Sequence, residues 1–183
     1  AASDVYKRQA FVLPIEGSNL PSVIGWRTIQ DTEQIIDIAS KKKKAIVIGG
    51  GLLGLECARG LLDQGMDVTV LHLAEWLMEM QLDRKAGDML RADLEKQGMK
   101  FELQANSKRI IGHEDVEAVE LADGRVIETD LVVMAVGIRP YTEVAKDAGL
   151  DVQRGIVVND FLQTSDSNTV SYTHLTLPTI YSV

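Results

Sequence analysis

The stretch Ala45-Ile46-Val47-Ile48-Gly49-Gly50-Gly51-Leu52-Leu53-Gly54-Leu55-Glu56 decides the fold of this chain. A short apolar run is followed by three consecutive glycines and then by residues that can continue as a helix. Gly49, Gly51 and Gly54 have the spacing G-x-G-x-x-G, which in a strand–turn–helix setting binds the pyrophosphate of a dinucleotide. We expect the first glycine to permit the turn, the second to admit the phosphates and the third to let the helix pack closely.

The predicted phosphate-binding segment also contains the residues between and directly after these glycines, which are Gly50, Leu52 and Leu53. The first turn of a helix has unpaired backbone N–H groups and carries roughly half a positive charge, so it attracts an anion. A glycine pattern alone is weak evidence for a ligand, because apolar glycine-rich turns are common. The elements that surround the pattern therefore decide its meaning.

These elements form a βαβ unit of about thirty residues, the setting that the pattern requires. A helix is predicted over Leu52–Gln64, Gly65 is placed to end it, and Asp67–Leu73 is the second strand. Lys100–Leu103 and the continuous apolar run Leu131–Val136 are predicted as further strands. The fold class is therefore α/β, a Rossmann-like domain with a parallel sheet.

An antiparallel β-meander is predicted over Ser107–Thr129, where short alternating segments are separated by turn residues. A second helix is predicted over Leu82–Gln97, with Asp83 as its N-cap. The buried stripe of that helix is predicted to contain Ala86, Met89, Leu90 and Leu94. Before it, Ala74–Gln81 is rich in methionine and is interpreted as core filling.

The segment before the glycine turn is predicted to be mostly irregular. Ala10–Gly25 has turn residues throughout, Trp26–Ile29 is a brief strand, and Asp31 is the N-cap of a helix. Lys41–Lys44 is interpreted as a solvated connection in preference to a nucleic-acid-binding patch, because the whole chain is acidic.

The bulk composition excludes several classes of protein. The chain has 183 residues, 45% of them hydrophobic, and a formal net charge of -8. An acidic balance argues against nucleic acid or an anionic membrane as a partner, and no run reaches the roughly 18 apolar residues of a spanning helix. The single cysteine cannot form an internal disulfide, so we expect a reducing, cytoplasmic location.

Both ends of the chain are expected to be non-native. Asp4–Gln9 can be back-translated into a DNA string whose reverse complement encodes Val170–His174 in another frame. The two ends resemble one sequencing adapter read in opposite orientations, so Ala1–Gln9 and Val170–Val183 are left out of the fold prediction. The remainder is then expected to be an internal fragment of a longer protein.

The pattern as a whole resembles a known family. The glycine motif extended to Glu56, the meander and Asp130–Pro140 are similar to the NAD(P)H-binding domain of the FAD-dependent pyridine nucleotide oxidoreductases. In that family this domain is inserted into an FAD-binding domain. Phe11–Gly17 resembles the segment that leaves the flavin domain, and Gly155–Ser165 resembles the return to it.

This resemblance implies a division of the chain and two bound nucleotides. Residues 10–40 would belong to the FAD-binding domain and its connection, residues 41–140 to the NAD(P)H-binding domain, and residues 141–169 to the return. NAD(P)H and FAD would be the cofactors, with most of the FAD site outside this segment. Glu56 and Gly137 would lie near the nicotinamide end of the coenzyme.

A narrower likeness is carried by Trp76–Asp83 and Asn159–Asp166, which are similar to the large subunit of NAD(P)H-dependent assimilatory nitrite reductases. That family passes a hydride from NAD(P)H to FAD, and then electrons through iron–sulfur and sirohaem centres to nitrite, giving ammonia. Those later centres need several thiolate ligands. They would therefore lie elsewhere in the same longer chain, and the remainder of that chain would be the partner of this segment. A rubredoxin or ferredoxin reductase-like protein, and a non-catalytic nucleotide-sensing module, remain alternatives.

His72 departs from the family pattern. An acidic residue usually holds the adenosine ribose about twenty residues beyond the first glycine, and His72 stands there with Glu75 three residues later. NADH and NADPH are therefore both left open, as are the final electron acceptor and the oligomeric state. Hydride transfer is the chemistry of the cofactors themselves, so no catalytic residue and no metal ligand is predicted.

Overall fold

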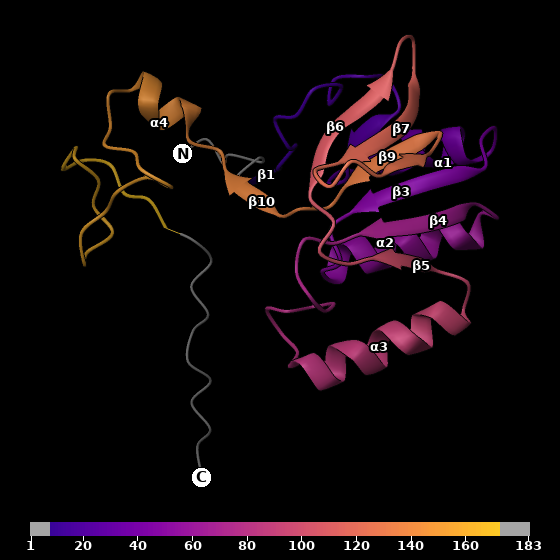
Figure 1. Cartoon of the computed structure of the whole chain (residues 1–183). Helices are drawn as coiled ribbons and strands as arrows, with labels where there is room; N and C mark the ends of the chain where they lie inside the picture. Colours follow the sequence, from indigo (N-terminus) through magenta and orange to yellow (C-terminus); the bar gives the residue numbers. More distant parts are fainter. Residues whose placement is uncertain (1–7, 173–183) are drawn as a thin grey trace. The chain divides into compact units, whose positions relative to one another are not determined.

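The computed structural model describes residues 8–172, and the described chain forms two units (Figure 1). The larger unit is Ala10–Ile138, and the smaller one contains the described residues on either side of it. The α-helices are α1 (Ile29–Ala39), α2 (Leu52–Asp63), α3 (Arg84–Lys96) and α4 (Glu143–Asp147).

Ten β-strands are described between residues 8 and 172. They are β1 (Arg8–Ala10), β2 (Val23–Gly25), β3 (Lys44–Ile48), β4 (Asp67–Leu71), β5 (Lys100–Glu102), β6 (Ser107–Gly112), β7 (Val116–Leu121), β8 (Val126–Glu128), β9 (Leu131–Met134) and β10 (Ile138–Pro140).

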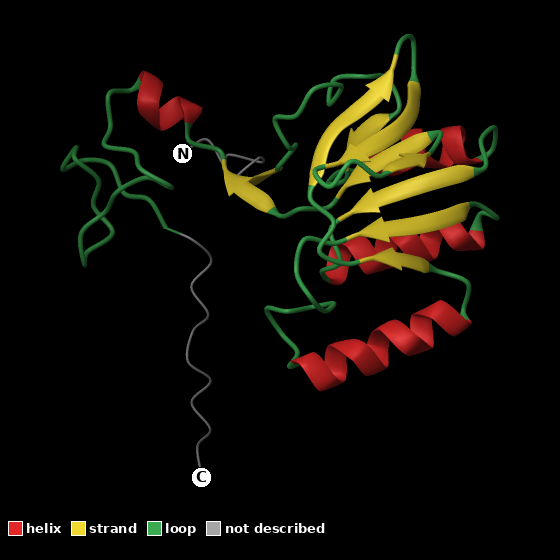
Figure 2. Cartoon of the chain, viewed as in Figure 1, coloured by secondary structure: helices red, strands yellow, loops and turns green. Residues whose placement is uncertain are grey.

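The centre of the larger unit is a five-stranded sheet in the order β2-β9-β3-β4-β5. Every pair of neighbours is parallel, and Val47 of β3 is in register with Val70 of β4 on one side and Val133 of β9 on the other. Consecutive strands β3 and β4 are joined by α2, which confirms the predicted βαβ unit (Figure 2). The α/β fold with a parallel sheet is thus confirmed.

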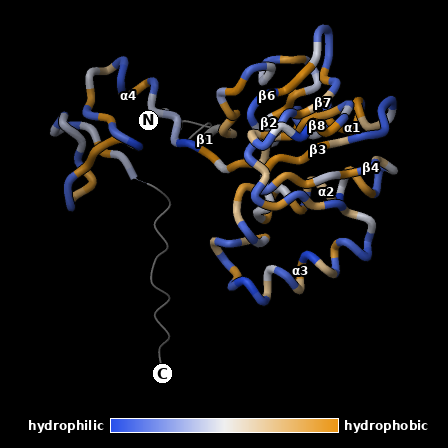
Figure 3. Tube along the Cα trace, in the orientation of Figure 1, coloured by the Kyte–Doolittle hydropathy of each residue, from blue (hydrophilic) through white to orange (hydrophobic). Residues whose placement is uncertain are grey.

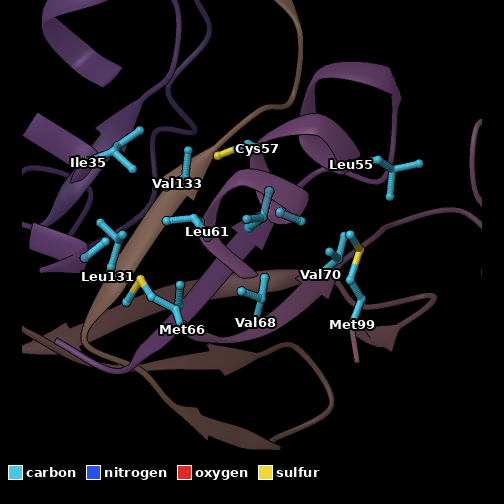
Figure 4. Close-up of a cluster of buried hydrophobic side chains, with 14 of the residues drawn as sticks. Ile35, Leu55, Cys57, Leu61, Met66, Val68, Val70, Met99, Leu131 and Val133 are labelled. Carbon is cyan, nitrogen blue, oxygen red and sulfur yellow. The ribbon is translucent and has the colours of Figure 1, made fainter. Parts of the chain in front are cut away.

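Each face of this sheet has its own hydrophobic core, because side chains alternate between the two faces along a strand. Val47, Val68 and Val133 join α1 and α2 in one cluster, part of which is drawn in Figure 4. Ile46, Leu71 and related side chains of the opposite face pack against the antiparallel sheet β6-β7-β8. The parallel sheet therefore lies between a helical layer and the antiparallel sheet. The predicted meander is thus confirmed.

The helix α3 is more exposed than its sequence predicted. Asp83 is its N-cap, as predicted, and accepts a hydrogen bond from Ala86 N–H at 2.8 Å. Leu90 and Leu94 pack against the core only partly, and Met89 is 66% exposed, so its place in the buried stripe was wrong. Figure 3 accordingly shows α3 as largely hydrophilic, whereas β3 is hydrophobic.

Two predictions before the glycine turn are also wrong. The brief strand is β2, Val23–Gly25, and not Trp26–Ile29, because β2 extends the sheet beside β9. The N-cap of α1 is Thr28, not Asp31: the Thr28 hydroxyl accepts from Asp31 N–H at 3.2 Å, and the Asp31 carboxylate accepts from Thr28 N–H at 2.6 Å. This is a capping box, in which Thr28 is the cap and Asp31 is the acidic residue three positions later.

The lysine run is only partly solvated. Lys44 begins β3, and the Lys42 side chain is 27% exposed. The Lys42 ammonium donates to the Asp115 carboxylate, to the Ser22 hydroxyl at 3.1 Å and to the Asp130 carbonyl at 3.2 Å. Lys42 therefore joins the start of β3 to the meander, so the prediction of a purely solvated connection was wrong for this residue.

The smaller unit has little regular structure in its described residues. Within its described residues, α4 is its one helix, and β10 pairs with β1 in a two-stranded sheet. A tight loop follows in which the Asn159 side-chain oxygen accepts from Phe161 N–H at 2.9 Å and Gln163 N–H at 3.1 Å. The predicted division into residues 10–40, 41–140 and 141–169 stays a prediction.

The predicted non-native ends lie mostly outside the described residues, which include residues 8–9 of the first end and residues 170–172 of the second. That prediction stays a prediction. Within residues 8–172, every helix is too short or too polar to cross a membrane.

Candidate nucleotide-binding site

The glycine turn lies where the strand order of the parallel sheet reverses. From β3 the chain continues to β4 and β5 on one side, and it returns through β9 to the other side. The carboxyl ends of β3 and β9 therefore meet at a topological switch point, where open α/β sheets bind their ligands. Gly49–Gly51 follow β3 directly, and Gly137 stands three residues beyond the end of β9.

Steric limits require glycine at two positions of the turn. Gly49 has φ +119°, and a β-carbon there would lie 2.4 Å from the Ala135 carbonyl oxygen. A β-carbon on Gly54 would lie 1.8 Å from the Gly49 carbonyl oxygen. The first glycine therefore lets the turn pass β9, and the third lets α2 start directly against the turn.

Gly51 leaves space in front of the helix. It is the N-cap of α2 without a side-chain cap, and a β-carbon placed on it would meet nothing within 4 Å. The hydrogen bond from Leu55 N–H to the Gly51 carbonyl, at 3.0 Å, is the first of the helix, so the N–H groups of the preceding turn have no intrahelical acceptor. Leu52 and Leu53 are 58% and 42% exposed in that turn.

Gly50 is held from both sides. Its N–H donates to His72 Nδ1 at 3.0 Å, and its carbonyl accepts from Met78 N–H at 3.1 Å. A β-carbon on Gly50 would lie 2.8 Å from the His72 ring and 2.8 Å from Leu77. The N–H of Gly50 is thus used inside the protein, which leaves the helix N–H groups beyond it to face a ligand.

His72 is buried beneath the turn, with 7% of its surface exposed. Because Nδ1 accepts the Gly50 N–H, the proton of the neutral ring is on Nε2. Nε2 lies 3.1 Å from the Trp76 carbonyl and 3.0 Å from the Glu79 carboxylate, so both are acceptors for that proton. The structure thus places this predicted cofactor-binding residue under the glycine turn, with both ring nitrogens already paired.

The methionine-rich segment after His72 supports the turn. Leu77 is fully buried against Gly50, and Met78 adopts φ +58° where its N–H reaches the Gly50 carbonyl. Trp76 donates from Nε1 to the Leu82 carbonyl at 3.0 Å. The interpretation of the methionines in this segment as core filling is confirmed in part for Met78, which packs partly buried against the core, and is wrong for Met80, which is 82% exposed.

The two acidic residues of this segment have different partners. The Glu75 carboxylate forms an ion pair with Arg84 at 3.0 Å. The Glu79 carboxylate forms its described polar contact with the His72 ring alone. Sequence reasoning noted Glu75 and missed Glu79; the signal was a carboxylate seven residues after a histidine in the ribose position.

The remaining predicted site residues are Glu56 and Gly137. Glu56 is exposed on α2. Gly137 has φ +106°, its carbonyl accepts from Phe11 N–H at 3.0 Å, and a β-carbon there would meet nothing within 4 Å.

Cys57 is buried on α2, and burial raises the pKa of its thiol to about 12. Residues 8–172 contain no cluster of ligating side chains for a metal ion.

This arrangement fits a dinucleotide. One edge of the sheet provides both room and hydrogen-bond donors. The room is the open space in front of Gly51 and beside the backbone of Gly137, and the donors are the free N–H groups in the first turn of α2. A pyrophosphate requires close backbone approach and N–H donors, and this edge supplies both.

Comparison with known proteins identifies the family. The family model described as pyridine nucleotide-disulphide oxidoreductase matches residues 8–170. The chain therefore belongs to the pyridine nucleotide-disulphide oxidoreductase family, as the resemblance predicted.

The similar proteins include two curated nitrite reductases and a ferredoxin reductase of known structure. A nitrite reductase (NAD(P)H) from Bacillus subtilis (strain 168) is 54% identical over 154 residues, covering 84% of this chain and 19% of that relative. A nitrite reductase (NADH) large subunit from Escherichia coli (strain K12) is 40% identical over 161 residues, covering 85% and 19%. A ferredoxin reductase from Rhodopseudomonas palustris superposes with TM-score 0.80 at 31% identity, covering 87% and 40%. The chain thus spans about a fifth of these curated relatives' length.

Proposed function

We propose that this chain is the NAD(P)H-binding part of a flavoprotein that passes a hydride from NAD(P)H to FAD, in the reduction of nitrite to ammonia. The observation that carries the proposal is the glycine turn at the switch point, where Gly51 is open in front of the first turn of α2. The identity of 54% to a nitrite reductase supports the choice of final acceptor.

In this proposal the protein holds and orients, and the bound nucleotides supply hydride transfer. The N–H groups of Leu52, Leu53 and Gly54 hold the pyrophosphate, and Gly51 lets it approach. Gly137 lets the nicotinamide end pass the backbone, and Glu56 lies near the carboxamide. Residues 41–140 form this domain, while residues 10–40 and 141–169 belong to an FAD-binding domain in a cytoplasmic enzyme.

The later centres, sirohaem and an iron–sulfur cluster, belong in this proposal to other parts of a longer chain, because one cysteine cannot ligate a cluster. A second candidate is a ferredoxin reductase-like enzyme, which the superposition with TM-score 0.80 favours. Both candidates use the same nicotinamide site and differ in the electron acceptor.

The coenzyme-binding step is tested by calorimetric titration of the purified chain with NADH and NADPH. We expect saturable binding of at least one of them, and no nitrite consumption by this chain alone. Absence of binding to both would overturn the proposal. The acceptor is tested on the complete reading frame that contains this segment: NAD(P)H-dependent conversion of nitrite to ammonia supports the first candidate, and reduction of ferredoxin without ammonia supports the second.

A further inference from the structure

The ribose end of the coenzyme site lacks the carboxylate at its usual place, and His72 takes the position. Its ring cannot serve as a free acceptor, because Nδ1 accepts the Gly50 N–H at 3.0 Å and Nε2 carries the proton. That proton points to the Glu79 carboxylate at 3.0 Å and the Trp76 carbonyl at 3.1 Å. His72 therefore fixes a carboxylate beside the glycine turn instead of supplying one.

Of the two acidic residues in this segment, Glu79 is the one whose negative charge is not balanced by a described lysine or arginine. The Glu75 charge is balanced by Arg84 at 3.0 Å, and both side chains are more than half exposed. The described partner of Glu79 is a neutral ring, which balances no charge, and the Glu79 side chain is 35% exposed and open to solvent. A carboxylate oriented by one hydrogen bond retains acceptor sites for a second donor.

We propose that Glu79, positioned by His72, accepts the hydrogen bond of the adenosine ribose 2′-hydroxyl and thereby selects NADH over NADPH. The inference rests on the proposed coenzyme site at Gly49–Gly54. A 2′-phosphate would bring its negative charge against the Glu79 carboxylate, which disfavours NADPH. Leu73–Leu82 contain no lysine or arginine to neutralise that phosphate, and the nearby Arg84 is engaged by Glu75.

The experiment measures the binding of NADH, NADPH and 2′-deoxy-NADH to the purified chain by isothermal titration calorimetry. We expect the wild type to bind NADH at least about tenfold more tightly than either of the other two, since a hydrogen bond to a charged group is lost with both. Glu79→Gln should weaken NADH binding by about tenfold and bring NADH and 2′-deoxy-NADH within about twofold of each other. Its NADPH affinity should stay equal or rise.

Glu75→Gln is the matched control, because it removes a carboxylate of the same segment that pairs with Arg84. It should leave NADH affinity within about twofold and, by releasing Arg84, improve NADPH binding. Equal binding of NADH and 2′-deoxy-NADH by the wild type would overturn the inference, as would unchanged NADH affinity in a folded Glu79→Gln variant. The deoxy comparison needs no variant, so equal binding of the two nucleotides would overturn the inference even where Glu79→Gln does not fold.

Failure of the inference differs from failure of the proposed function. A wild type that binds no nicotinamide nucleotide contradicts the coenzyme site itself. A wild type that binds NADH with no dependence on the 2′-hydroxyl, or that prefers NADPH, retains the coenzyme site and overturns the role of Glu79 alone.

Discussion

The α-carbon of Gly54 faces the Gly49 carbonyl oxygen so closely that an added β-carbon would lie 1.8 Å from it. Both atoms belong to the backbone, so no side-chain rotation can relieve the clash. The end of β3, the turn and the first turn of α2 are consequently one tightly packed unit. The free N–H groups of α2 face the switch point because this contact fixes where the helix begins.

Replacing Gly54 by alanine is therefore expected to damage both stability and binding. The Gly54→Ala variant should lose about 3 kcal/mol of unfolding free energy, the upper part of the range for overpacking. Urea unfolding measures the loss, and NADH titration should show weakened binding because the helix N-terminus moves. Gly60→Ala is the control in the same helix: its β-carbon meets nothing within 4 Å, so about 0.5–1 kcal/mol of stabilisation is expected. A Gly54→Ala variant as stable as the wild type would contradict the packing argument.

Leu77 supports the turn from below, and its truncation is expected to weaken the site from a distance. Leu77 is fully buried against Gly50, so Leu77→Ala should cost about 2–5 kcal/mol of unfolding free energy. NADH affinity should fall as well, because Gly50 loses its support. Met80→Ala in the same segment removes a side chain that is 82% exposed and should change stability by less than about 0.5 kcal/mol. Thermal unfolding and calorimetry measure both effects, and equal losses in the two variants would refute this role of Leu77.

The sequence was sufficient for those features that local chemistry determines. The glycine spacing, the βαβ unit around Gly49 and the cap at Asp83 depend on neighbouring residues, and the structure has them in the predicted places. The brief strand was misplaced because β2 exists through its pairing with β9, more than a hundred residues later. The partnership of His72 with Gly50 and Glu79 was not predictable either, because the fold of the intervening loop decides it.

Cys57 is expected to be chemically silent in the folded protein. It is buried on α2, and burial raises the pKa of its thiol to about 12, so almost no thiolate exists at pH 8. Labelling with a thiol-reactive disulfide reagent at pH 8 should be slow in buffer and should reach one thiol per chain in urea, since the chain has one cysteine. Rapid stoichiometric labelling of the native protein would show that Cys57 is accessible.

Asp115 should give the protein a defined sensitivity to acid. Burial alone would raise the pKa of this carboxyl, but hydrogen bonds from Lys42, Ser22 and Val116 outweigh burial and lower the pKa from 3.8 to about 2. A carboxyl whose folded pKa lies below its unfolded value stabilises the protein above the unfolded pKa, and the contribution is lost as the pH falls through the folded pKa. The loss from this group is therefore expected between about pH 4 and pH 2.

The size of that loss is limited by solvent, because the Asp115 side chain is 39% exposed and the pair with Lys42 is screened. Asp115→Asn should lower the unfolding free energy at pH 7 by no more than about 1 kcal/mol, and the difference from the wild type should shrink between pH 4 and pH 2. Urea unfolding across that range measures it. Asp37→Asn is the control, because its ion pair with Lys41 is exposed on both sides and joins neighbouring turns of one segment. A difference in unfolding free energy between Asp115→Asn and the wild type that stays constant down to pH 2 would contradict this assignment. Lys42 would then stabilise the fold without the Asp115 charge.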